Sequence, residues 1–193
     1  MPPTAPEVEH FRAAVLFADI SGFTPLTEAL AQESLEGPEE LTRLLNAYFS
    51  RMIAIAEAQG GEVAQFSGDA LTVLFPTVLE DLGVATRRAR QAAETMQAAM
   101  SEFAALETSA GPVALGMKIG IGAGEILAAS VGGLFGRWEH VIAGDPLRQM
   151  AQAEHRAGRG EIALSPEADA VIAPHPIEAR PLPQPDWTRL QDP

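Results

Sequence analysis

Two aspartates lie where a folded chain rarely places a charge, and both are candidates for chemistry. Asp19 stands near the end of the apolar run 13–20, which has the composition of a strand buried on both faces. Asp69 lies at the predicted tip of a hairpin between two extended segments, 62–66 and 71–75. If the first strand lies beside this hairpin, the two carboxylates come close together in space.

Neighbouring ionised carboxylates repel each other, and a shared proton or a bound cation relieves the repulsion. Oxygen ligands favour Mg²⁺ or Mn²⁺, which bind substrate phosphates through one or two carboxylates. Between Asp19 and Thr24 the chain is small and turned, so Gly22 lets the backbone approach a ligand and the next helix offers free N–H groups. Taken singly, Asp19 and Asp69 fit ordinary turns. Their order on compatible elements favours a site for metal and phosphate.

The charge balance narrows the classes of partner. The formal net charge is −13 over 193 residues, and Lys118 is the only lysine. A strongly anionic surface repels phosphate backbones, which excludes a non-specific nucleic-acid binder and a polybasic membrane-surface protein. The absence of cysteine excludes disulfides, thiolate nucleophiles and sulfur-based zinc sites. The N-terminus has no signal-peptide pattern and no apolar run is long enough to span a bilayer, so we expect a cytoplasmic protein.

Hydrophobic periodicity and turn residues predict the elements that position the two aspartates. Thr24 is predicted to cap a first helix, and a second runs from Gly37 to Gly60 with an apolar stripe that includes Tyr48. After the hairpin we expect a helix over 80–106, followed by a strand pair over 113–121 and 125–131 that turns at 122–124. A strand at 141–142 then leads to a helix capped by Asp145. The last predicted elements are a strand over 161–164 and a short helix from Ser165.

This order predicts an α+β fold, a ferredoxin-like βαββαβ core with additional strands and helices. The predicted organisation is an N-terminal arm over 1–12, one domain over 13–173, and a proline-rich tail or linker to a further domain over 174–193.

The motifs around the aspartates then point to a family. Phe-Ala-Asp-Ile-Ser-Gly-Phe-Thr at 17–24 and Phe-Ser-Gly-Asp-Ala at 66–70 resemble the two metal-binding motifs of the class III adenylate/guanylate cyclases, and the segments 118–125 and 141–145 resemble the family's later strands and turn. The resemblance covers 13–165. It implies the class III cyclase fold, a dimer, and conversion of a nucleoside triphosphate, ATP or GTP, to its 3′,5′-cyclic monophosphate and pyrophosphate.

The resemblance also implies roles for individual residues. By analogy Asp19 and Asp69 hold two divalent metal ions, Mg²⁺ or Mn²⁺, and the Ile20 carbonyl adds a ligand. The residues expected to contact phosphate or nucleotide are Ser21, Gly22, Phe23, Thr24, Gly68 and Lys118. A solvated lysine on an edge strand is the alternative interpretation of Lys118.

Four positions depart from the family's pattern. Gln65 stands where the family has its base-selecting lysine, and Val141 stands where an aspartate or threonine reads the purine. Arg148 and Gln152 occupy the positions of the catalytic asparagine and arginine. The chain therefore keeps the metal half of the site, as in the first of the tandem domains of soluble adenylate cyclases, and a second cyclase domain, in the same or another chain, or a second copy is the expected partner.

These residues are compatible with three functions. The favoured one is a nucleotidyl cyclase domain, with ATP preferred over GTP, whose activity needs a complementary domain. The second is a catalytically degenerate domain that binds nucleotide and regulates an attached effector. The third, another enzyme on a palm-like fold such as a diguanylate cyclase, is disfavoured because the hairpin tip at 66–70 lacks that family's acidic Gly-Gly-Asp/Glu-Glu-Phe pattern.

Overall fold

The computed structural model describes residues 5–33, 37–77, 80–133 and 137–173. One mixed sheet has the strand order β2-β3-β1-β6-β7, with β8 paired parallel to β6. Its strands are β1 (Glu7–Ser21), β2 (Glu62–Ser67), β3 (Ala70–Pro76), β6 (Gly116–Gly132), β7 (Trp138–Ala143) and β8 (Ile162–Leu164). The part formed by β2, β3, β1 and β6 has the order of a ferredoxin-like sheet, which confirms the predicted fold class. The tail over 174–193 lies outside the described residues.

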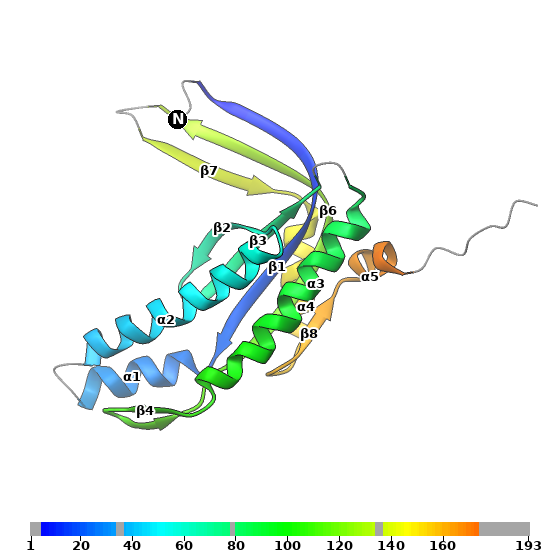
Figure 1. Ribbon diagram of the computed structural model, residues 1–193. Coiled ribbons are helices and arrows are strands. Elements are labelled where there is room, and N and C mark those ends of the chain that lie inside the picture. The colour runs from blue at the N-terminus through cyan, green and yellow to red at the C-terminus, as the bar shows by residue number, and fades with distance from the viewer. Residues whose placement is uncertain (1–4, 34–36, 78–79, 134–136, 174–193) are drawn as a thin grey trace, which may run out of the picture.

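Helices cover both faces of this sheet (Figure 1). They are α1 (Phe23–Glu33), α2 (Gly37–Ala58), α3 (Leu82–Ala99), α4 (Asp145–Arg156) and α5 (Pro166–Ile172), with a 3-10 turn over Met100–Phe103 and a small hairpin of β4 (Leu106–Thr108) and β5 (Gly111–Val113). None of the helices described is long and apolar enough to cross a membrane.

The apolar run of β1 is explained by packing on both of its faces. Ala14, Leu16 and Ala18 belong to the larger core cluster, together with residues of α1, α2 and α3. Ala13 and Val15 point the other way, into a second cluster that includes Met150 of α4. Alternate residues of one strand therefore fill two cores, as the continuous hydrophobic pattern predicts.

The predicted strand pair over 113–131 is wrong, because the structure has one continuous strand, β6. Gly122 does not turn the chain. It lets α4 approach the sheet, since a Cβ there would lie 2.3 Å from the carbonyl oxygen of Pro146. The glycine pattern of 120–124 therefore reflects helix packing rather than a hairpin.

Three predicted helix boundaries also differ from the structure. Helix α1 begins at Phe23, so Thr24 lies inside its first turn and does not cap it. The N-cap of α4 is Gly144, and Asp145 binds the side chains of Arg148 and Gln149 instead of capping the backbone. The long helix predicted over 80–106 is shorter, since α3 starts after its N-cap Asp81 and ends at Ala99. Strand β1 starts at Glu7, inside the predicted N-terminal arm.

Candidate functional site

The structure brings Asp19 and Asp69 together at one end of the sheet. Strand β1 runs antiparallel to β3 with Ala18 opposite Leu71, so Asp19 lies one residue beyond this pair. Asp69 is in the tight turn between β2 and β3, where Gly68 adopts a φ of 65°. Burial is the main cause that raises the pKa of Asp19, and the negative charge of Asp69 raises it further. The two carboxylates therefore share one partly desolvated region.

Two buried hydroxyl groups add to this region. Among the described residues, the Oη of Tyr48 and the Oγ of Ser21 are buried without a hydrogen-bond partner. Burial raises the pKa of Tyr48 above its ordinary value, and the charges of Asp19 and Asp69 raise it further. Sequence reasoning assigned Tyr48 to the apolar stripe of α2 alone, and nothing in its spacing pointed to the aspartates.

The predicted phosphate contacts follow Asp19 directly. Gly22 has a φ of 95°, a conformation that favours glycine, and α1 starts at the next residue. The first N–H groups of any helix have no partner within the helix, so those of α1 are available at the end of β1. The side chain of Ile20 is 4% exposed and belongs to the core, so only its backbone is available to a ligand. Thr24, in the first turn of α1, and Gly68, in the turn between β2 and β3, are both exposed.

Lys118 faces Asp19 across the β1–β6 pair. Its Nζ lies 2.7 Å from Oε1 of Glu154 on α4, and this hydrogen bond is the main cause that raises the pKa of Lys118. The negative charge of Glu154 also raises the pKa of Asp19, whereas Lys118 lowers it. Lys118 is therefore part of an ion pair under α4 rather than an isolated edge-strand lysine. Glu154 was not singled out from the sequence.

Gln65 and Val141 lie at opposite edges of the sheet and the structure does not bring them together. Gln65 is on β2 at one edge, and Val141 is on β7 at the other, where its side chain is 44% exposed. Val141 pairs with Ala129, which pairs with Val8 on β1. The strand path from Val8 to Asp19 is about 36 Å, at the usual rise of about 3.3 Å per residue. Within one chain, Val141 is therefore far from the aspartates.

The two positions on α4 contact each other instead of the aspartates. Arg148 donates to Asp145 Oδ1 at 2.8 and 2.9 Å, and to Gln152 Oε1 at 3.2 Å. Both side chains are exposed. The Arg148 guanidinium contributes to a lowered pKa of Asp145, although the hydrogen bond from Gln149 is the larger cause. Arg148 is thus held along its own helix by its neighbours.

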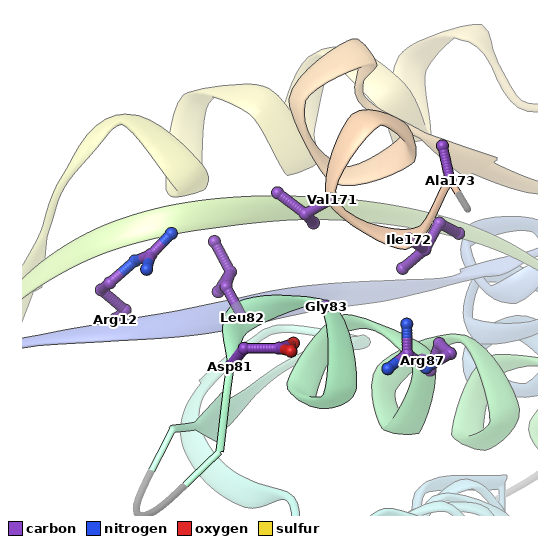
Figure 2. Close-up of a pocket in the computed structure, with 8 residues that line it drawn as sticks. All are labelled: Arg12, Asp81, Leu82, Gly83, Arg87, Val171, Ile172 and Ala173. Carbon is purple, nitrogen blue, oxygen red and sulfur yellow. The ribbon is translucent and has the colours of Figure 1, made fainter. Parts of the chain in front are cut away.

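A cavity of about 450 Å³ lies elsewhere, between β1, the start of α3 and the end of α5 (Figure 2). It is lined by Arg12, Asp81, Leu82, Gly83, Arg87, Val171, Ile172 and Ala173. Figure 2 shows the carboxylate of Asp81 on the same side of the cavity as Arg87, with Arg12 at the other end. Neither Asp19 nor Asp69 lines this cavity, so the candidate site is the end of the sheet that carries the two aspartates.

Comparisons with known proteins agree with this fold. The adenylate cyclase type 10 of the rabbit Oryctolagus cuniculus is 30% identical over 167 residues, which cover 85% of this chain and 10% of that protein. The crystal structure of the adenylyl cyclase CyaB from P. aeruginosa is similar with a TM-score of 0.72 and 27% identity, covering 86% of this chain and 82% of that one. The guanylate cyclase domain of RhGC from Catenaria anguillulae, solved in complex with GTP, has the same fold, with a TM-score of 0.70 and 22% identity over 86% of this chain and 85% of that one.

The chain thus spans about a tenth of the length of the rabbit relative. The family model of the adenylate and guanylate cyclase catalytic domain matches residues 6–181, which include every element that positions Asp19 and Asp69. With the ferredoxin-like sheet and the paired aspartates in place, this match shows that the chain belongs to the adenylate and guanylate cyclase catalytic domain family.

Proposed function

We propose that the chain converts ATP, in preference to GTP, to 3′,5′-cyclic AMP and pyrophosphate, and that it supplies the metal-binding half of a site completed by a second cyclase domain. The choice of ATP is supported by the rabbit relative and the P. aeruginosa structure, both of which are adenylate cyclases by name. The observation that carries the proposal is that Asp19 and Asp69 lie together in one chain, whereas Val141 lies on the edge strand β7 and Arg148 donates to Gln152 on its own helix.

The residues present fit two divalent metal ions. Asp19 and Asp69 are carboxylates that repel each other in a partly buried region, which a cation relieves. The buried Ser21 Oγ, which has no partner among the described residues, adds a hard oxygen atom two residues after Asp19. An oxygen donor set of this kind suits Mg²⁺ or Mn²⁺. Asp19, Asp69 and the Ile20 carbonyl are the residues proposed to hold the two ions.

The reaction forms a bond between the ribose 3′-oxygen and the α-phosphorus and breaks the bond from that phosphorus to the β-phosphate. Pyrophosphate leaves, and the proton of the 3′-hydroxyl passes to solvent. Bound divalent ions supply charge neutralisation and lower the pKa of the attacking hydroxyl. The backbone N–H groups of Gly22, Phe23 and Thr24 bind phosphate oxygens at the start of α1. Lys118, although paired with Glu154, keeps a positive charge near this end of the sheet.

A second domain is needed because two kinds of group are missing near the aspartates. Gln65 and Val141 replace the lysine and the aspartate or threonine that select the base, and they lie on opposite sheet edges. Gln152 replaces the arginine that neutralises the phosphoryl oxygens, and Arg148 is bound to Asp145. A positioned arginine is worth roughly three to five decades of rate in comparable phosphoryl transfers. The isolated chain should therefore turn over little ATP.

Calorimetry with Mn²⁺ and ATP tests the proposed metal site. Asp19→Ala and Asp69→Ala should each abolish metal-dependent nucleotide binding, whereas Asp169→Asn on α5 removes a carboxylate remote from the site and should leave it unchanged. Unchanged affinity in both alanine variants would remove Asp19 and Asp69 from the site.

A regulatory domain that binds nucleotide without chemistry is the second candidate. It is favoured by the hydrogen bonds of Arg148 to Asp145 and Gln152, which hold this arginine along its own helix. The two functions differ in turnover once a complementary domain is added. Cyclic AMP formed in that mixture supports the cyclase, and bound but unconverted ATP supports the regulatory domain.

A further inference from the structure

The sole tyrosine of the chain is buried beside the proposed metal site. Tyr48, on α2, is 1% exposed and belongs to the larger core cluster. Its ring meets Phe49 and Phe103 edge to face, with centroids 5.2 and 5.7 Å away. The ring is therefore fixed by packing, and its hydroxyl is buried with it.

That hydroxyl has no hydrogen-bond partner among the described residues. Buried tyrosine hydroxyls usually find one, because a phenolic O–H removed from water without a partner is unfavourable. A phenylalanine would fill the same core space without this cost. The Tyr48 hydroxyl therefore needs a partner that the described part of the chain does not supply.

The surroundings of the ring indicate where that partner lies. Burial is the main cause that raises the pKa of Tyr48, and the charges of Asp19 and Asp69 both add to it. Phe49, the next residue on α2, meets Phe66 of β2 edge to face with ring centroids 5.2 Å apart, and Phe66 lies three residues before Asp69. This packing places Tyr48 near the hairpin that carries Asp69, where a phenolic hydroxyl is able to donate to a carboxylate.

We infer that Tyr48 is a positioning residue of the metal centre, whose hydroxyl donates a hydrogen bond to the oxygen atoms that a cation orders at Asp19 and Asp69. This inference rests on the proposed function, since it requires those aspartates to hold a divalent ion. Hydrogen bonds to ligating carboxylates orient them, and loss of such a partner typically lowers metal affinity about 10- to 100-fold.

The matched variants are Tyr48→Phe and Thr86→Val. The first variant removes the Tyr48 hydroxyl and leaves the ring in place. The second removes a buried hydroxyl on α3 that already donates to the Leu82 carbonyl at 2.7 Å, away from the aspartates. Tyr48→Phe should bind Mn²⁺ about tenfold or more weakly by electron paramagnetic resonance, yet melt at a higher temperature without metal. Thr86→Val should keep the metal affinity and melt lower.

A direct readout uses the single tyrosine. In the full chain labelled with ¹³C at the tyrosine ζ carbon, titration with Mg²⁺ should shift the one signal, and Asp69→Asn should abolish the shift. An unshifted signal together with unchanged Mn²⁺ affinity of Tyr48→Phe would overturn the role of Tyr48 while the metal site stands. Absence of Mn²⁺ binding by the wild-type chain would overturn the proposed metal site, and the role of Tyr48 with it.

Discussion

Gly120 on β6 is where the packing of α4 is most sensitive to one added methyl group. A Cβ at this position would lie 2.1 Å from the carbonyl oxygen of Met150 and 2.4 Å from the backbone nitrogen of Glu154. Both atoms belong to the helix backbone, so no side-chain rotation relieves the overlap. To restore an ordinary contact of 3.4 Å, α4 must retreat from the sheet by about 1.3 Å in this close-packed region.

Gly120→Ala should therefore destabilise the protein by about 1–3 kcal/mol, the usual cost of overpacking a core. For a chain of this size that lowers the melting temperature by roughly 2–12 °C. The same retreat would lengthen the contact of 2.7 Å between Lys118 and Glu154, so the ion pair should weaken as well.

Urea unfolding followed by circular dichroism measures how much Gly120→Ala lowers the free energy of unfolding, and Ala128→Val is the control. Ala128 lies on the same strand but lines an open cavity of about 240 Å³, so the added methyl groups have room. A loss below about 0.5 kcal/mol for Gly120→Ala, within the range of neutral surface changes, would refute the close approach of α4 to β6.

Three further changes test other contacts of the fold. Asp81→Ala removes the side chain that accepts from the Val84 N–H at 2.9 Å, and should cost about 1 kcal/mol in urea unfolding; no loss would contradict the N-cap of α3. Lys118→Met leaves Glu154, whose side chain is 13% exposed, without its partner, and should lower the free energy of unfolding by about 1–3 kcal/mol. If the two residues form the ion pair, the double variant with Glu154→Gln should regain most of this stability. The Ser109 hydroxyl donates to Glu40 at 2.6 Å and holds the pKa of that carboxyl below its ordinary 4.5. A lowered pKa stabilises the folded state above the ordinary value and loses that effect as the pH falls through the folded value, so Ser109→Ala should be less stable than wild type at pH 7 and equally stable in acid. A difference that persists in acid would assign the effect to something other than Glu40.

The parts of the fold that the sequence predicted are those with local signals. In three places a few neighbouring residues were enough to predict the local structure: the apolar run of β1, the hairpin turn at Gly68, and the proline and acidic residues that start α2. The pairing of Asp19 with Asp69 followed from the expected strand order, which the structure confirms. Their roles as metal ligands stay a prediction.

The errors share a physical cause, which is long-range packing. Gly122 has the local pattern of a turn, yet it is small because α4 lies against it. Tyr48 has the spacing of a core residue, and only the folded chain shows that its hydroxyl lies in the electrostatic field of two aspartates more than twenty residues away in opposite directions along the chain. Glu154 likewise meets Lys118 only after α4 packs on β6.

The central claim is that this chain supplies the metal half of a cyclase site and a second domain supplies the rest. The direct test mixes the purified chain with a cyclase domain that carries the family's lysine, asparagine and arginine but has both of its own metal aspartates replaced by alanine. Cyclic AMP formation with Mn²⁺ and ATP should appear in the mixture, be nearly absent for either protein alone, and vanish with Asp19→Ala in this chain. Turnover by this chain alone at the rate of the mixture, or turnover of the mixture that survives Asp19→Ala, would contradict the account.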